Sequence, residues 1–361
     1  MSTRNIVNAV ASIKARLMNS AREHETTFNA LLVRYANERF LYRLSISPFR
    51  DHLILKGGNL FLIWQNGLPY RPTIDTDFLV LGQSTPEYLK TLFSNVCNSI
   101  IPEPDGLSFD ATSIQGTQIR EEAQYGGTRI TLFAFLGPVR IHLQFDIGIG
   151  DAITPAPELS KYPVILDFPA PILYTYPKET AIAEKTKTMT SLGMVNSRMK
   201  DFADILILQR NFSFNFSLLQ TAIQRTYKRY DIPIPTSLPI CFSEDFAHSP
   251  TKQVQWTAFR KKSRFPNSLF TLNKSYLNAR SSCSPCYFLP PPFLQNGNPI
   301  LDGFSPKEHP IDNYSFRKHF YTPKGTGSPP VPFTFSIAGE HKRPPAGLLS
   351  CPSNTIRRTR P

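Results

Sequence analysis

One short stretch, residues 53–78, constrains the fold of this chain more than any other. Its first residues, 53–55, are apolar and predict a strand. Gly57 and Gly58 then predict a tight turn, and the apolar run 60–64 predicts a helix that begins at this turn. A turn of this kind leaves backbone N–H groups at a helix N-terminus, and glycine lets a phosphate approach the backbone closely. The stretch therefore predicts an anion-binding turn.

Two aspartates at a spacing of two follow the turn. Asp75 and Asp77 lie on the next predicted strand. Residues i and i+2 of a strand point to the same face, roughly 6.6 Å apart, so both carboxylates can reach one Mg²⁺ ion. A metal clamp beside a phosphate-binding turn is typical of phosphoryl or nucleotidyl transfer. The plainer interpretation is a tight turn followed by a solvated acidic strand end.

The bulk composition indicates a globular chain. Its 361 residues are enough for two domains, and 41% of them are hydrophobic. Because no charge-free apolar run approaches ~18 residues, we expect no membrane span. The N-terminus leads into an amphipathic stretch and the five cysteines are scattered, which predicts a cytoplasmic protein with reduced thiols.

The basic charge is concentrated in the last hundred residues. The whole chain carries a formal net charge of +13, and residues 261–361 hold 14 Lys and Arg against 4 Asp and Glu, together with 16 of the 33 prolines. We expect this tail to lack a core, and two hypotheses explain it. It is either a disordered basic arm that contacts RNA electrostatically, or the product of a reading-frame shift near Arg260. The abrupt change in composition favours the frame shift.

Apolar periodicity predicts the remaining elements. Helices are expected at 5–22, 28–44, 87–100, 179–192, 196–209, 214–230 and, weakly, 244–259. Strands are expected at 107–114, 129–135, 139–147 and 164–168, with a hairpin turn at Gly137 and Pro138. The helix at 28–44 is expected to place Arg34, Asn37 and Arg43 on its outer face.

Further candidate site residues follow downstream. Asp146 ends a predicted strand, where it either completes a three-carboxylate site or caps a turn. On the helix 196–209, Arg198, Asp201 and Asp204 are spaced by three and share one face. They form either ion pairs worth a few tenths of a kcal/mol each or a substrate wall. In the second interpretation Lys185 neutralises a triphosphate, and Arg198 and Lys200 orient it.

Taken in order, these motifs resemble the AbiEii/AbiGii-toxin type of nucleotidyltransferase, in the DNA polymerase β-like superfamily. The resemblance covers roughly residues 5–259 and rests on segments 28–45, 55–58, 71–77, 146–151, 176–185, 192–204 and 253–259. It implies an α/β (α+β) fold: a nucleotidyltransferase core with a mixed sheet flanked by helices, a helical N-terminal preface and a helical C-terminal region. The implied domains are 1–175 and 176–259, followed by the tail 260–361.

The resemblance also implies the roles of the site residues. Three carboxylates would bind Mg²⁺ or Mn²⁺, with the last also placed to act as a base: Asp75, Asp77 and Asp146. The implied nucleotide-binding set is Lys56, Gly57, Gly58, Asn59, Lys185, Arg198, Lys200, Asp201 and Asp204. Asn59 stands where the superfamily often has Ser, Thr or Ala, and its amide can still hydrogen-bond a phosphate.

The implied activity is that of a toxin in a bacterial abortive-infection or toxin–antitoxin system. An acceptor hydroxyl would attack the α-phosphate of a nucleoside triphosphate in line, and two metal ions roughly 4 Å apart would stabilise the attacking and leaving oxygens. The acceptor would be an RNA, tRNA among the candidates, or a protein hydroxyl, and the genetic neighbour would be an antitoxin. Two rival hypotheses are a non-catalytic nucleotide- or RNA-binding module and an inactive product of a frame-shifted gene.

Overall fold

The structure is a computed structural model of the whole chain, and it describes residues 3–67, 70–71, 73–119 and 126–263. The predicted tail therefore lies outside the described residues, apart from residues 260–263. Within those ranges, no helix is both long enough and apolar enough to cross a membrane.

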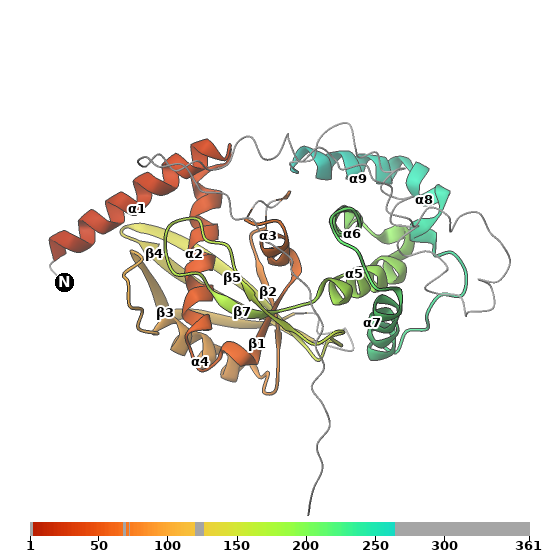
Figure 1. The fold of residues 1–361 in the computed structure, drawn as a ribbon, viewed down its shortest axis with the longest axis horizontal. Coiled ribbons are helices and arrows are strands. Elements are labelled where there is room, and N and C mark those ends of the chain that lie inside the picture. Colours follow the sequence, from red (N-terminus) through yellow and green to blue (C-terminus); the bar gives the residue numbers. More distant parts are fainter. Residues whose placement is uncertain (1–2, 68–69, 72, 120–125, 264–361) are drawn as a thin grey trace, which may run out of the picture. The chain divides into compact units, whose positions relative to one another are not determined.

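A mixed sheet forms the centre of the fold (Figure 1). In the part of the chain that the structure describes, it has seven strands in the order β3-β4-β5-β2-β1-β7-β6. The strands are β1 (Leu53–Lys56), β2 (Thr76–Val80), β3 (Leu107–Ile119), β4 (Gly127–Leu136), β5 (Val139–Ile149), β6 (Glu158–Lys161) and β7 (Ile172–Thr175). Strand β2 runs antiparallel to β1 and parallel to β5. The predicted α/β fold with a mixed sheet is confirmed.

Helices lie before, between and after the strands along the sequence. They are α1 (Thr3–Glu23), α2 (Phe28–Ser45), α3 (Leu60–Trp64), α4 (Pro86–Cys97), α5 (Lys178–Leu192), α6 (Met199–Asn211), α7 (Phe216–Arg229), α8 (Glu244–His248) and α9 (Pro250–Lys261). Their starts follow from capping: Thr27, for example, accepts a hydrogen bond from the Ala30 N–H at 3.2 Å and begins α2. The expected helices are present, with ends shifted by a few residues. The weak expectation at 244–259 is resolved into α8 and α9.

Two hydrophobic cores hold these elements. In the first, α2 packs on the sheet, and the Phe40 ring lies 4.5 Å from that of Phe145 on β5. The second core belongs to α5 through α9, where the rings of Phe202 and Phe246 stack at 5.3 Å. Phe61 of α3 joins this second core, which ties the segment after the glycine turn to the helical region.

The strand expected at 164–168 is wrong. These residues form no ladder; the structure has β6 before them and β7 after them. Prolines at 163 and 169 flank the apolar run and interrupt strand pairing. The Ile165 N–H instead donates to the Glu38 carboxylate at 2.8 Å, so a side chain takes the place of a strand partner.

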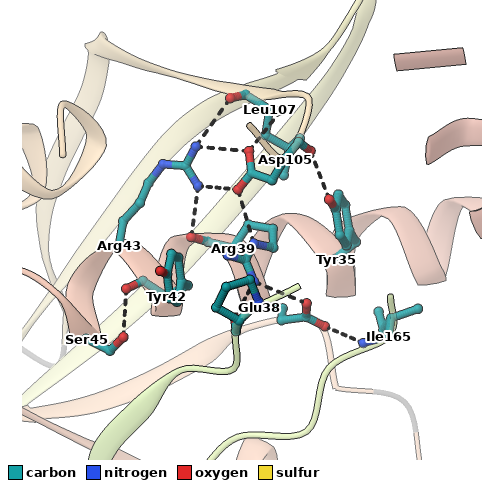
Figure 2. A network of polar contacts seen from close by, with 10 residues as sticks. Tyr35, Glu38, Arg39, Tyr42, Arg43, Ser45, Asp105, Leu107 and Ile165 are labelled. Carbon is teal, nitrogen blue, oxygen red and sulfur yellow. Dashed lines mark hydrogen bonds and ion pairs between the residues drawn. The ribbon is translucent and has the colours of Figure 1, made fainter. Parts of the chain in front are cut away.

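The outer face expected for α2 is also corrected, because Asn37 and Arg43 are both only 4% exposed. Figure 2 shows the polar network that accounts for Arg43. Its guanidinium binds both oxygens of the buried Asp105, at 2.6 and 3.1 Å, and the neighbouring Arg39 binds Asp105 Oδ2 at 3.1 Å. Two buried arginines are therefore held by one carboxylate from the loop before β3.

Candidate active site

The glycine turn and the aspartate strand meet across the β1–β2 ladder. Lys56, the last residue of β1, is the register partner of Asp77 on β2. On its other side, Asp77 is the register partner of Asp146 on the parallel strand β5. Registered neighbours project to the same face of a sheet. The fold thus brings together three predicted site residues that lie far apart in the sequence.

The backbone of the turn packs directly on the Asp77 side chain. Gly57 has φ +73°, a left-handed conformation, and a Cβ placed on it would overlap the Asp77 carboxylate. A Cβ on Gly58 would lie 2.8 Å from Thr73 Oγ1 and 3.1 Å from Arg71 Nη1. Both glycines are therefore required by close approach, and at Gly57 the neighbour is a predicted metal ligand.

Asp75 lies one residue before β2, and Asn59 fixes its backbone. The Asn59 amide donates to the Asp75 carbonyl at 3.0 Å and to Thr76 Oγ1 at 3.3 Å, and its oxygen accepts from the Tyr162 hydroxyl at 3.0 Å. Asn59 is only 4% exposed. Its amide thus orders the segment that carries Asp75, and the predicted contact with a nucleotide stays a prediction.

Several charges act on Asp77. Burial raises the pKa of its carboxyl, and the charges of Asp75 and Asp146 raise the pKa further, while Lys56 and Lys200 oppose the shift. Three carboxylates therefore share one electrostatic environment in which the negative charge on Asp77 is disfavoured. Hard oxygen donors in such a setting suit a divalent cation such as Mg²⁺.

The side chains of the three aspartates are not arranged as a metal-binding group in this structure. Asp146 is bound by Arg129, with Nε to Oδ1 and Nη2 to Oδ2 both at 2.8 Å. In the described ranges, no group of three His, Cys, Asp or Glu side chains is arranged so that it could hold a metal ion. The donor chemistry of Asp75, Asp77 and Asp146 fits Mg²⁺, and their assignment as its ligands stays a prediction.

The helical region contributes a buried cluster of opposite charges. Lys185 of α5 lies 3.1 Å from Asp201 Oδ1 and 2.5 Å from Asp204 Oδ2 of α6. Arg198 binds Asp201 at 2.7 Å, and Arg71 binds both oxygens of Asp204 at 3.1 and 3.2 Å. Burial lowers the pKa of Lys185 to about 8, although Asp201 opposes the shift. The ion pairs expected on this helix face are present, and the substrate wall stays a prediction.

Two arginines of this region were not among the predicted site residues. Arg129 pairs with Asp146 because the two-residue turn at Gly137 and Pro138 sets the β4–β5 register. The position of this turn in the sequence is enough to predict the pairing. Arg71 lies beside Gly58 and binds Asp204, 133 positions later. The sequence around Arg71 gives no indication of a contact with a residue so far along the chain.

A strand ending in a glycine turn, followed by a carboxylate-bearing strand at the centre of a mixed sheet, is the arrangement expected of a nucleotidyltransferase core. The family model described as "Nucleotidyl transferase AbiEii toxin, Type IV TA system" matches residues 39–274. The chain belongs to the AbiEii family, it is a nucleotidyltransferase, and the family is the toxin side of a toxin–antitoxin system. The resemblance inferred from the motifs is confirmed.

Solved structures give a more distant likeness. A candidate nucleotidyltransferase from H. pylori is 15% identical, with a TM-score of 0.41. The superposition covers 72% of this chain and 96% of the H. pylori chain. JHP933 from Helicobacter pylori is 15% identical, with a TM-score of 0.41, and covers 70% of this chain and 92% of its own. A search of curated proteins gives no match.

Proposed function

We propose that this chain transfers a nucleotide from a nucleoside triphosphate to a hydroxyl of an RNA, tRNA among the candidates, or of a protein, with Mg²⁺ or Mn²⁺ as cofactor. The observation that carries the proposal is the position of Asp77, against the Gly57 backbone on one side and in register with Asp146 on the other. Phosphate-binding and cation-binding groups are then immediate neighbours.

The residues of the chain have separate roles in this reaction. The Gly57–Gly58 backbone and Lys56 receive the phosphates; Asp75, Asp77 and Asp146 would hold the cation, with Asp146 released from Arg129. When bound, the cation neutralises charge on the phosphate oxygens. The acceptor oxygen forms a bond to the α-phosphorus, the bond to the β-phosphate oxygen breaks, and pyrophosphate leaves. Asp146 takes the proton of the acceptor hydroxyl.

The buried charged cluster of α5 and α6 lines the other side of the nucleotide site in this proposal. Lys185 faces the triphosphate, and Arg198 and Lys200 orient it, with Asp201 and Asp204 holding Lys185 in place. Lys200 acts electrostatically on both Asp77 and Lys185, which supports one shared site. The first hydrophobic core lies mainly within 1–175, the proposed catalytic part; the second lies mainly within 176–259, the proposed helical part, and also includes Phe61 and Tyr70.

As a toxin, the protein would act in the bacterial cytoplasm, and the antitoxin implied by the family would restrain it. The test is a transfer assay with the full chain, Mg²⁺, each of the four α-labelled nucleoside triphosphates in turn, and total bacterial RNA plus bulk protein. We expect label in one fraction with one nucleotide, and none after EDTA or with Asp77→Asn.

Each negative result of the transfer assay points to a different rival hypothesis. A folded protein that binds a nucleoside triphosphate and labels nothing would contradict the proposal and leave a non-catalytic binding module. A chain without a cooperative unfolding transition would indicate the inactive product of a frame-shifted gene. Label that persists undiminished in Asp77→Asn would place the chemistry at other residues.

A further inference from the structure

A fourth carboxylate, Asp151, lies next to the candidate site and has no part in the proposed chemistry. We propose that Asp151 is a positioning residue that holds the Lys56 ammonium in one place, ready for the phosphates of the nucleotide. The proposal rests on the phosphate-binding role given to Lys56 above and adds the residue that sets where this cation lies.

The contacts converge on one buried carboxylate. Lys56 Nζ donates to Asp151 Oδ2, which also accepts from the Tyr176 hydroxyl at 2.7 Å. The other oxygen, Oδ1, accepts from the Tyr230 hydroxyl at 3.3 Å. The side chain of Asp151 is only 6% exposed and that of Lys56 is 21% exposed. Asp151 is thus enclosed by donors, while its cation partner keeps access to solvent.

Lys56 would have another partner without Asp151. It is the register partner of Asp77, and a lysine has a flexible four-carbon stem that must be held to occupy one position. Asp151 takes the ammonium instead, and the Tyr176 ring lies 5.3 Å from Nζ as a cation–π surface. This arrangement leaves the Asp77 carboxylate available for the proposed cation and fixes the lysine charge beside Asp151 and Gly148.

Electrostatics agrees with the geometry. Burial opposes the charge on Lys56, but the carboxylates of Asp151 and Glu184 outweigh it and raise the pKa of this lysine. Burial also acts against ionised Asp151, and Lys56 together with the two tyrosine hydroxyls lowers the pKa of its carboxyl. Each group thus keeps the other ionised at neutral pH.

Asp151 is itself held by three parts of the fold. It follows β5 through Gly150, whose φ is +72° and whose carbonyl accepts from Arg229 Nε. Tyr176 precedes α5, and Tyr230 follows α7. The end of β5, the segment before α5 and the residue after α7 therefore meet at the carboxylate that fixes Lys56. Packing of that region is thereby coupled to the position of a phosphate-binding cation.

A merely structural ion pair is the alternative, because removing one partner of a buried pair destabilises a fold whatever its function. A double-mutant cycle separates the two. We would measure binding of the four α,β-methylene nucleoside triphosphates, by calorimetry with Mg²⁺, to full-length wild type, Asp151→Asn, Lys56→Met and the double variant. Asp167→Asn, which removes the exposed partner of Arg16, is the control for loss of a surface carboxylate.

We expect Asp151→Asn to weaken binding about tenfold, the effect of losing one charged contact, and to change nothing further once Lys56 is methionine. Asp151→Glu should restore part of the affinity, and in the transfer assay Asp151→Asn should raise KM more than it lowers kcat. Equal losses from Asp151→Asn in both backgrounds, or unchanged binding in the wild-type background, would overturn the proposal.

Two further results keep the outcomes distinct. If Asp151→Asn does not fold, Tyr230→Phe removes one hydrogen bond to Asp151 and should weaken binding two- to threefold only while Lys56 is present; an effect independent of Lys56 would contradict the proposal. Wild-type protein that binds nucleotide but transfers nothing contradicts the proposed function alone. Wild type that binds none of the four analogues contradicts both.

Discussion

Gly57 and Asp77 occupy adjoining space: the position that a Gly57 side chain would take is filled by the Asp77 carboxylate. The contact joins the end of β1 to the start of β2, and it sets the backbone of the turn directly against the strand that carries Asp77. A phosphate at the turn would therefore lie close to any cation held by Asp77.

The first prediction concerns this contact. Gly57→Ala should reduce nucleotide transfer about 100-fold, because the new methyl group displaces the Asp77 carboxylate and misplaced reacting groups cost about that much. Gly82→Ala is the matched control: its φ is +82°, so it carries similar backbone strain, but an added Cβ would meet no described atom within 4 Å. Equal transfer rates for the two variants at matched thermal stability would show that the contact is unimportant.

A second prediction concerns the buried network of Figure 2. Asp105→Asn should lower the free energy of unfolding by about 3–5 kcal/mol, because Arg39 and Arg43 would lose the carboxylate that compensates their burial. Urea denaturation measures the loss. Asp167→Asn, whose side chain is 91% exposed in its pair with Arg16, should change stability little. Similar effects from the two substitutions would contradict the account of this network.

The third prediction is a pH dependence of stability. Burial raises the pKa of Glu38 from 4.5 to about 7, although the Ile165 N–H and Arg39 oppose the shift. Between these two values the folded state binds more protons than the unfolded state, so the free energy of unfolding falls as pH rises through this window. Glu38→Gln keeps an acceptor for Ile165 and removes the titration.

The free energy of unfolding of this variant minus that of wild type should be about 2 kcal/mol larger at pH 8 than at pH 5. Urea denaturation at the two pH values gives the difference. Stability profiles that stay parallel between wild type and Glu38→Gln would place the titration at another group.

Much of the fold was predictable because local pattern decides it. The helices of this chain have apolar residues at helical spacing, and β4 and β5 alternate around a two-residue turn, so the residues that specify each element lie within it. The strand wrongly expected at 164–168 has the right composition. Its ladder partner is missing because a buried glutamate, 127 positions earlier, takes the Ile165 N–H.

The burial of charge was not predictable in the same way. Arg43 and Asn37 occupy positions of α2 that polar composition assigns to solvent, and the burial of Arg43 is compensated by the carboxylate of the distant Asp105. The pairing of Lys56 with Asp151 likewise depends on β5 and β1 entering one sheet. Candidate site residues could be proposed from motifs, whereas partners that come from distant segments, such as Asp151 for Lys56, are found only in three dimensions.

We expect Asp77 to be essential to transfer and dispensable for the fold. The most direct measurement compares the transfer rate of wild type, Asp77→Asn and Asp75→Asn at saturating nucleotide and Mg²⁺, with circular dichroism and thermal unfolding recorded on the same samples. We expect a loss of at least ~10³-fold in each variant, because removing one predicted carboxylate ligand removes several kcal/mol of transition-state stabilisation, while the unfolding temperature does not fall. Transfer within a few-fold of wild type in either folded variant would contradict this expectation.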